Sequence, residues 1–432
     1  MKQNIRKYNY AIMSILLFFV TLQMSFAQIV NISTVAELEA FRDDVNAGNN
    51  YKGVVVELKN DINLSAISNW VSIGDENTPF CGVFNGNDFT ISEMKIILNS
   101  NYQGLFGYTD SAEVKNLTVS GKIVRRISSS EALNYRGGII GLACATSIIN
   151  CKNLCNIEDE IDENSCNGGI VGKAESGTHI KKCENLGKID GGFYVGGICG
   201  LVTRNEYDYS DLNVIIEDCI NRGEIVSRIV AFGVPDPFLN NNFNHSSAGG
   251  ICGKFELGEM RGTNENYGRI SSTIASGGIC GFINNTVNLE KAVLINHKEA
   301  SFSEATYVGG IFGVYACYLY SIKEPNLEVY GTFINKANIH IVKEFGIAAN
   351  LGGIFGVIFS EKGNTNKYNF LTKCENYGDI IFTGYNLGGI VGAINTPESS
   401  IIFSNSNNYG RIYGDSDHYI RIGGICGILK GQ

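Results

Sequence analysis

Proline is scarce in this sequence. Only five of the 432 residues are proline, whereas 52 are glycine. A glycine-rich chain that is poor in proline and keeps plentiful Ile, Val and Phe does not have the composition of a disordered linker. No stretch rich in proline, serine or charge divides the chain. We therefore expect many tight turns that join many short strands.

Long apolar segments are also lacking beyond the N-terminus. The first residues are basic, an apolar stretch runs from Ile12 to Leu22, and Ser25-Phe26-Ala27 has the pattern of a cleavage site. The apolar stretch is short for a membrane span. Residues 1–27 are therefore predicted to be a cleaved signal peptide, with no membrane insertion afterwards. We expect an exported protein that is extracellular, bound to the cell surface or periplasmic.

Positive charge is in short supply. The chain has 34 basic and 43 acidic residues, and three of the basic ones lie in the predicted signal peptide, so the net charge after cleavage is near −12. Such a balance argues against nucleic acid and anionic membrane surfaces as partners.

Histidine is equally sparse, and no nucleophile or phosphate-binding motif is present. No GxSxG, Walker or dinucleotide-binding fingerprint occurs in the sequence. The five histidines are scattered without the spacing of metal ligands: His179, His245, His297, His340 and His418. We expect no catalytic residue, no metal site and no cofactor, and we predict that the protein is not an enzyme.

Acidic residues cluster in three places. The densest run is EDEIDE at Glu158–Glu163, and smaller pairs are Asp208 with Asp211 and Asp415 with Asp417. Solvated loops are the expected explanation. A calcium site or a catalytic carboxylate pair is the alternative, although none of these groups recurs at one repeat position.

A glycine pentad repeats along the chain. The pattern GGI-x-G begins at nine glycines, and a degenerate tenth copy, QGLFG, begins at Gln103. Successive copies are 28 to 53 residues apart. The nine pentads begin at Gly137, Gly168, Gly196, Gly249, Gly277, Gly309, Gly352, Gly388 and Gly423.

A second element, C-x-N-x-G-x-I, lies between consecutive pentads. CENLGKI at Cys183 is a clear copy, with Cys, Asn, Gly and Ile at the odd positions and charges at most even ones. Alternation of this kind indicates a strand with one buried face. The recurring asparagine is predicted to form a structural hydrogen-bonded ladder. Its members are Asn153, Asn185, Asn221, Asn266, Asn296, Asn335, Asn376 and Asn408.

Short strands repeated every 30 residues or so cannot bury their apolar faces without stacking on one another. The sequence thus predicts an all-β fold: a right-handed parallel β-helix, or solenoid, of about ten coils. A propeller is the rival, but its blades are usually longer. Thr34–Asn46 has the capping box and apolar face of a helix that covers the first coil. Residues 28–100 would form this helix and irregular coils, and residues 101–432 the repeats.

The repeats resemble those of the GLUG-motif proteins of bacterial surfaces. The likeness covers nearly the whole mature chain, from STVAELEAF at Ser33 through QGLFG to the last pentad. It implies an exported β-helical region. Ile replaces the family's Leu in nine of ten pentads, which is a mild departure. Such repeats also accompany IgA-cleaving metallopeptidases, but the HExxH motif of their zinc domain is absent here, so the resemblance implies no peptidase activity.

Thirteen cysteines are present, an odd number for an exported protein. Eight occupy repeated strand positions where sister repeats carry residues such as Ile, Phe or Ser, so we expect most to be buried free thiols. One or two disulfides between adjacent coils, or a metal or catalytic role, are the alternatives.

Insertions offer the best candidate binding residues, because solenoid insertions map to loops on one face. Three follow the pentad, at Val202–Val214, Val314–Thr332 and Ile358–Thr372, and a fourth spans Arg228–Ser247. Aromatic side chains on such loops suit sugar stacking or protein contact. The alternative is that the loops pack their aromatics onto the coil. The candidates are Tyr207, Tyr209, Tyr315, Tyr318, Tyr320, Tyr330, Phe359 and Tyr368.

The sequence favours a non-enzymatic, exported scaffold that binds a glycan or an extracellular protein in the manner of an adhesin. A β-helical polysaccharide lyase or glycoside hydrolase is one alternative. A structural spacer, or a fragment of a larger adhesin, is another.

Overall fold

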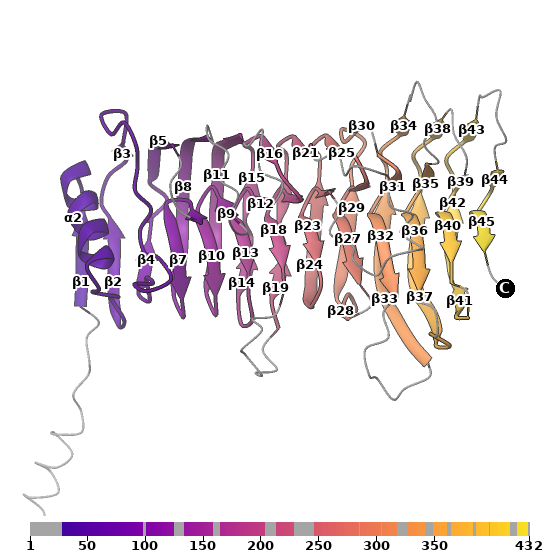
Figure 1. Ribbon diagram of the computed structural model, residues 1–432, viewed down its shortest axis with the longest axis horizontal. Helices are drawn as coiled ribbons and strands as arrows, with labels where there is room; N and C mark the ends of the chain where they lie inside the picture. The colour runs from indigo at the N-terminus through magenta and orange to yellow at the C-terminus, as the bar shows by residue number, and fades with distance from the viewer. Residues whose placement is uncertain are drawn as a thin grey trace, which may run out of the picture.

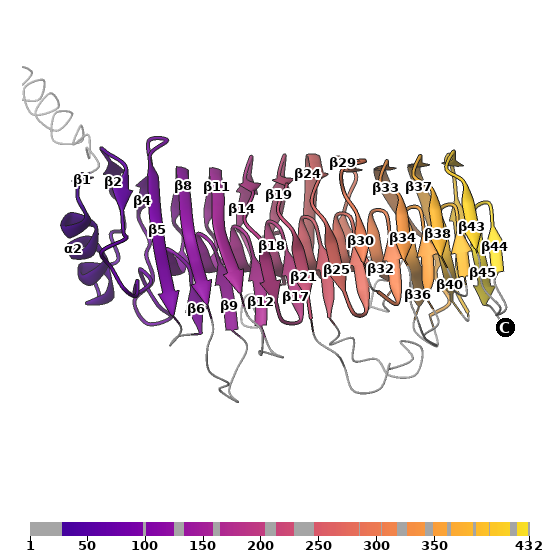
Figure 2. The same ribbon diagram turned by 90° about the horizontal axis from the view of Figure 1, so that it is seen from above.

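The chain folds into a long parallel β-helix, as predicted. The computed structural model describes residues 28–97, 101–124, 134–158, 165–203, 213–228, 246–284, 286–303, 305–317, 326–341, 349–360, 364–382, 386–396, 398–414 and 421–430. Its strands stack side by side along one axis (Figure 1), and the second view shows the same row of coils from above (Figure 2). All neighbouring strands whose register is given run parallel, for example β10 (Ile140–Cys144) with β13 (Val171–Ala174). The predicted signal peptide lies outside the described residues.

Three long sheets form the walls of the solenoid. Each coil passes from sheet 1 to sheet 2, turns at the glycine pentad into sheet 3, and returns to sheet 1. Sheet 1 comprises β1 (Gln28–Ile32), β2 (Val54–Leu58), β3 (Ile62–Asn63), β4 (Val83–Asn85), β5 (Thr90–Ile97), β8 (Glu113–Val124), β11 (Ser147–Glu158), β14 (His179–Lys181), β15 (Glu184–Asn185), β16 (Ile189–Gly191), β19 (Ile215–Glu217), β20 (Ile220–Asn221), β21 (Ile225–Ser227), β24 (Gly258–Asn266), β25 (Ile270–Ser272), β28 (Val287–Asn288), β29 (Ala292–Asn296), β30 (Phe302–Ser303), β33 (Asn326–Asn335), β37 (Lys367–Asn376), β41 (Ser400–Phe403) and β42 (Ser406–Asn408).

Sheets 2 and 3 have ten strands each, and a small sheet follows sheet 1 in the later coils. Sheet 2 comprises β6 (Tyr102–Gln103), β9 (Asn134–Gly137), β12 (Ser165–Gly168), β17 (Tyr194–Gly196), β22 (Ser247–Gly249), β26 (Ala275–Gly277), β31 (Tyr307–Gly309), β35 (Asn350–Gly352), β39 (Asn386–Gly388) and β44 (Arg421–Gly423). Sheet 3 comprises β7 (Phe106–Asp110), β10, β13, β18 (Cys199–Val202), β23 (Cys252–Phe255), β27 (Cys280–Asn284), β32 (Phe312–Cys317), β36 (Phe355–Ser360), β40 (Val391–Asn395) and β45 (Cys426–Lys430). The small sheet comprises β34 (Ile339–Ile341), β38 (Ile380–Phe382) and β43 (Ile412–Gly414).

Each pentad marks one coil. The first glycines of the nine GGI-x-G pentads pair in unbroken register along sheet 2, from Gly137 to Gly423. Gln103 of the degenerate copy lies opposite Arg136 in the same sheet. The unequal spacing of the pentads therefore reflects residues inserted between strands, and the coils themselves stay in phase.

A helix covers the first coil, at the indigo end in Figure 1. The helix α2 (Val35–Asn46) begins at the N-cap Thr34, whose hydroxyl accepts the Glu37 amide hydrogen while the Glu37 carboxylate accepts the Thr34 amide hydrogen. Its buried residues are Leu38, Phe41 and Val45, and the Phe41 ring contacts Phe80 and Phe84 in the first coils. Among the described residues, no helix is long and apolar enough to cross a membrane.

The asparagines of the second element form a ladder inside the solenoid. Each side-chain amide donates to the carboxamide oxygen of the asparagine in the next coil, at 2.7–3.0 Å. In seven of the eight asparagines the side-chain amide also donates to a backbone carbonyl two residues further on, as Asn335 does to Ala337. Seven of the eight side chains are fully buried, from Asn153 to Asn376. Every coil from Asn153 to Asn408 is thus joined to its neighbour by a polar bond within an apolar core.

The second glycine of eight of the nine GGI-x-G pentads packs against this ladder, Gly424 of the last described coil being the exception. A Cβ added there would lie 2.0–2.5 Å from a ladder side chain, as at Gly138 against Asn153 and at Gly310 against Asn335. The backbone of the turn between sheets 2 and 3 therefore contacts the asparagine side chains of sheet 1. This close approach explains why the two sequence elements recur together, because each asparagine needs a residue without a side chain opposite it.

Sheets 2 and 3 also bury side chains on the faces that point away from the main core. Lys254 of sheet 3 lies with its ammonium 4.9 Å from the ring centroid of Tyr194 in sheet 2, and Lys173 lies similarly at 5.0 Å from Tyr135. These side chains belong to apolar clusters separate from the core, which continue toward the C-terminus around Phe282 and others. Side chains of sheets 2 and 3 thus pack against one another on the outer side of the coil as well as in the main core. This arrangement also explains why a lysine can follow the last glycine of a pentad.

All thirteen cysteines have free thiols in the structure, and ten of them are buried. The stacked Cys183 and Cys219 each place the sulfur near backbone carbonyls of their own and the preceding coil, at 3.4–3.6 Å. Burial raises the pKa of the Cys166 thiol to about 12 and that of Cys374 to about 11. Because the thiolate is the reactive form, these thiols should be inert in the native protein.

Titration of the thiols with a chromogenic disulfide reagent checks this expectation. In the native protein we expect only the partly exposed Cys81, Cys144 and Cys426 to react, and after denaturation without reductant we expect nearly all thirteen to react. Two or fewer free thiols in the denatured protein would instead mean that the cysteines form a disulfide framework.

Candidate functional site

Three of the predicted binding residues are buried instead, Tyr315 and Tyr368 in the main core and Phe359 in the apolar cluster outside the coil, and for them the expected exposure on loops is wrong. Tyr315 and Tyr368 are 1% and 0% exposed, and Phe359 is 4% exposed. The Tyr315 ring lies 5.3 Å from Phe370 between centroids, and the Tyr368 hydroxyl accepts a hydrogen bond from the Asn364 amide. These aromatics pack onto the coil, which is the alternative stated for them above.

The physical reason is that the insertions lengthen strands. β32 and β36 each run for six residues, and β33 and β37 for ten, so they include part of what was expected to be loop. Alternate side chains of a strand face opposite sides, and in β32 and β36 both sides are buried. Tyr330, on the outward side of β33, is 38% exposed. Tyr207, Tyr209, Tyr318 and Tyr320 lie outside the described residues.

Exposed rings lie instead on the outer face of sheet 1. They occupy the fourth position of the C-x-N-x-G-x-I element, next to the ladder asparagine, and face solvent because the asparagine faces inward. We call this line of side chains the outer row. It consists of Leu154, Leu186, Arg222, Tyr267, His297, Lys336, Tyr377 and Tyr409.

Sequence reasoning missed the outer row because it grouped the even positions together as mostly charged and did not consider the fourth position separately. The sequence does carry a signal: the fourth position holds Leu, Arg, Tyr, His or Lys and no Asp or Glu in any of the eight copies. Large side chains at an exposed strand position are unusual enough to mark a surface for attention.

The rings of the outer row stack on one another along the solenoid. Tyr267 and His297 are parallel within 8°, with centroids 4.0 Å apart, and the Arg222 guanidinium lies 4.3 Å from the Tyr267 centroid. Tyr377 and Tyr409 form a second pair, 4.8 Å apart at 17°. The ring planes therefore lie across the row, so a ring face is available only where a stack ends.

Ion pairs between neighbouring coils flank the outer row on both sides. Glu184 accepts from Lys152 and Arg222, each at 2.8 Å. Further along, Arg411 pairs with Asp379 at 2.5 Å. In the second, fourth and sixth positions of the element, every lysine and arginine of the described chain except Lys336 has such a carboxylate partner.

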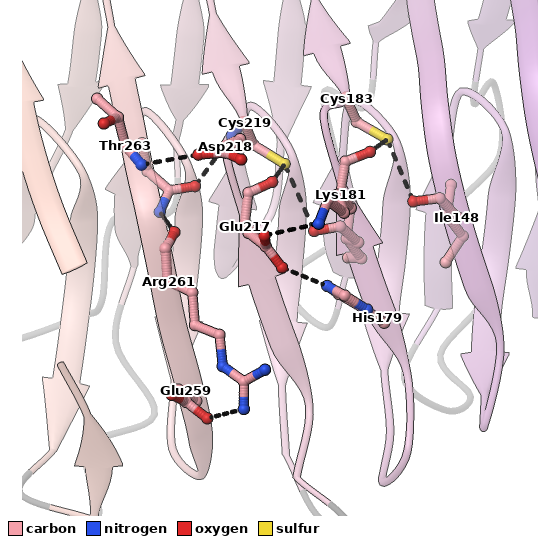
Figure 3. A network of polar contacts seen from close by, with 12 residues as sticks. Ile148, His179, Lys181, Cys183, Glu217, Asp218, Cys219, Glu259, Arg261 and Thr263 are labelled. Atoms are coloured by element: carbon pink, nitrogen blue, oxygen red, sulfur yellow. Dashed lines mark hydrogen bonds and ion pairs between the residues drawn. The ribbon is translucent and has the colours of Figure 1, made fainter. Parts of the chain in front are cut away.

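The same face has a second network nearer the sheet 3 side, shown in Figure 3. Glu217 lies 2.7 Å from the Lys181 ammonium and 3.0 Å from His179 Nε2. In the next coil Arg261 pairs with Glu259 at 2.6 Å. These pairs join adjacent coils or neighbouring positions of one strand.

Three of these carboxylates, Glu184, Glu217 and Asp379, have a lowered pKa. The hydrogen bond from Lys181, opposed by burial and assisted by His179, lowers the pKa of Glu217. Arg411 lowers the pKa of Asp379 through hydrogen bonds from its side chain and backbone. For Glu184, burial works toward a higher pKa, but the bonds from Lys152 and Arg222 outweigh it and the pKa is lowered. Carboxyl groups of this kind are poorly suited to donate a proton near neutral pH.

The other candidate groups are described only in part. Glu158 pairs with Lys122 at 2.7 Å, whereas residues 159–164, 204–212 and 415–420, which hold the remaining acidic candidates, lie outside the described residues, as do His245 and His418. Within the described part of the chain, no group of three His, Cys, Asp or Glu side chains is placed to hold a metal ion.

Comparison with known proteins adds little to this geometry. No protein-family model matches the chain, and no curated protein sequence matches it. One solved structure with some similarity is a crystal structure titled "putative immunoglobulin A1 protease from Bacteroides ovatus". It is 17% identical over 77% of this chain and 82% of that chain, with a TM-score of 0.41. A likeness of this size carries no argument about function.

Proposed function

We propose that the protein is an exported, non-enzymatic scaffold of the GLUG-motif type that binds a glycan at the cell surface through the outer row. The observation that carries the proposal is the outer row itself, with two stacked ring pairs on the exposed face of a rigid sheet. Rigid strands hold such rings in place before a ligand arrives, so little side-chain entropy is lost on binding.

A glycan is favoured over a protein partner by the ends of the stacks. Tyr377 is 48% exposed and Tyr409 is 60% exposed, so parts of their rings remain open to a ligand. Sugar rings pack their C–H faces on aromatic faces, whereas the lysines and arginines that flank the row are already paired and offer little to an acidic protein surface.

A scaffold role is favoured over catalysis by the state of the acidic side chains. Glu184, Glu217 and Asp379 all have a lowered pKa and a cationic partner in an adjacent coil. Glycoside hydrolysis needs one carboxyl group that can remain protonated until it donates. Ion pairs that link the coils fit a structural role for these groups.

An array of extracellular glycans, probed with the mature protein, tests the proposal. We expect binding to a subset of glycans, and we expect the double variant Tyr267→Ser with Tyr377→Ser to weaken that binding at least tenfold, or about 1.4 kcal/mol. Tyr413→Ser is the matched control, because Tyr413 is 58% exposed on β43 and lies outside the outer row. Equal binding by the double variant, or binding to deglycosylated proteins alone, would contradict the proposal.

A further inference from the structure

A second group of apolar side chains shares the outer face of sheet 1 with the outer row. Tyr330 of β33, Leu371 of β37 and Ile402 of β41 are 38%, 43% and 53% exposed. Their strands are neighbours toward the orange and yellow end of the solenoid (Figure 1). Val293 of β29, in the coil before β33, is partly exposed on the same face. We call these four residues the apolar strip.

The apolar strip is self-complementary under a two-fold rotation. Tyr330 lies directly opposite Leu371 in the sheet, so an axis normal to the sheet and midway between the two exchanges their positions. Val293 lies opposite the residue two places after Tyr330, one coil further out. Ile402 lies opposite the residue two places before Leu371, one coil further out on the other side. The same axis therefore exchanges Val293 and Ile402.

A second copy of the chain, placed face to face about this axis, would bring apolar side chains together four times. Tyr330 of each copy would meet the partner's Leu371, and Ile402 of each copy would meet the partner's Val293. Two sheets can pack in this way with their strand directions within about 30° of each other.

The charged neighbours of the apolar strip follow the same symmetry. Glu328 lies two residues before Tyr330 on β33. Lys373 lies two residues after Leu371 on β37, so the axis exchanges these two charges as well. Glu328 is exposed, and the Lys373 side chain is 55% exposed although it pairs with Glu375 at 3.1 Å. Opposite charges would thus meet twice at the rim, where such pairs add little affinity but fix the register.

The area available is that of a stable dimer. Rotation about the axis lays the coils of β29, β33, β37 and β41 over the same four coils of the second copy. β33 and β37 are ten residues long. With strands about 4.8 Å apart and about 3.3 Å per residue, the shared face measures about 600 Å² before side-chain relief is added. A standard interface buries about 800 Å² of accessible surface per partner.

We propose that the apolar strip is the interface of a homodimer in which two copies pack face to face through sheet 1 about this two-fold axis. Such an interface is isologous and closes on itself. A different protein partner would not require the strip and its charges to repeat under a rotation. The inference goes beyond glycan binding and does not depend on it, because the outer row lies six residues further along each coil, as Tyr377 does from Leu371.

Sedimentation velocity of the mature protein tests the proposal. We expect a dimer at a protein concentration of about 100 μM, which would detect even a weak association. Leu371→Arg places a cation at the centre of the interface twice and should raise the dissociation constant of the dimer at least tenfold. Leu186→Arg is the matched control, because Leu186 is 41% exposed on the same face and lies outside the apolar strip.

Exchange of the two charges tests the axis itself. Glu328→Lys and Lys373→Glu should each weaken self-association, because each variant places like charges opposite each other. An equimolar mixture of the two should associate at least fivefold more tightly than either alone, since both contacts between the unlike copies again join opposite charges.

Three results would overturn the proposal: a wild-type protein that stays monomeric at this concentration, a dimer that Leu371→Arg leaves unchanged, or a mixture that associates no more tightly than its components. The substituted residues are exposed, so the variants should fold, and far-UV circular dichroism checks this point.

Discussion

Replacing Gly310 by alanine should destabilise the solenoid by about 3 kcal/mol, at the upper end of what overpacking costs. The added Cβ would lie 2.1 Å from the Gly353 carbonyl oxygen and 2.3 Å from the Asn335 carboxamide carbon. Neither group can move freely, because the carbonyl belongs to the next coil's turn and the carboxamide is held by four hydrogen bonds. Urea unfolding followed by circular dichroism measures the change.

Gly424 provides the matched control for this substitution. It occupies the same pentad position in the last described coil, yet an added Cβ there meets nothing within 4 Å. Gly424→Ala should therefore change the unfolding midpoint little. Similar destabilisation by both substitutions would mean that glycine is needed for its backbone conformation and that the contact with the ladder is unimportant.

Replacing Asn335 by alanine should cost about 3–5 kcal/mol. The side chain donates to Ala337 and Asn376, accepts from Asn296 and the Ala337 amide, and is fully buried. Its loss leaves buried donors and acceptors without partners, each at a cost of about 1–3 kcal/mol, partly relieved by relaxation. Hydrogen exchange should show the loss first in β33, β34 and β37, because solenoid coils contact only their neighbours.

Asn408 is the corresponding control in the last described coil. It accepts from Asn376 and donates to Gly410, but it is only partly buried, so water can replace the lost bonds. We expect Asn408→Ala to cost about 1 kcal/mol or less. An Asn335→Ala protein as stable as the wild type would show that the hydrogen bonds of the ladder contribute nothing to the free energy of unfolding.

The coil architecture could be predicted closely from the chain itself. The pentad recurs once per coil, and its first glycine stays in register from Gly137 to Gly423 despite insertions. The capping helix was predicted over Thr34–Asn46, and α2 spans Val35–Asn46 after its N-cap Thr34. Both predictions succeeded because the signals are local: a capping box, a 3.6-residue period and a two-residue alternation.

The candidate site was harder to predict, because it depends on where inserted residues go. Tyr315 and Tyr368 looked like loop residues, yet the inserted residues extended strands and turned these rings into core. A shift of one residue along a strand moves a side chain from the surface to the interior. The outer row was overlooked for a related reason: its members matter as a stack, and stacking joins residues that are 30 to 45 positions apart in the sequence.

The sequence by itself determined the repeat, the phase of every coil and the buried column of asparagines, since each of these is a pattern of residue types at regular spacing. Only the tertiary structure decided which exposed side chains meet. It placed Gly310 against Asn335, which accounts for the pairing of the two sequence elements. It also brought Tyr267 against His297 and Tyr377 against Tyr409. Parallel stacking brings successive coils to within one strand spacing, and that proximity cannot be seen in the linear order of the residues.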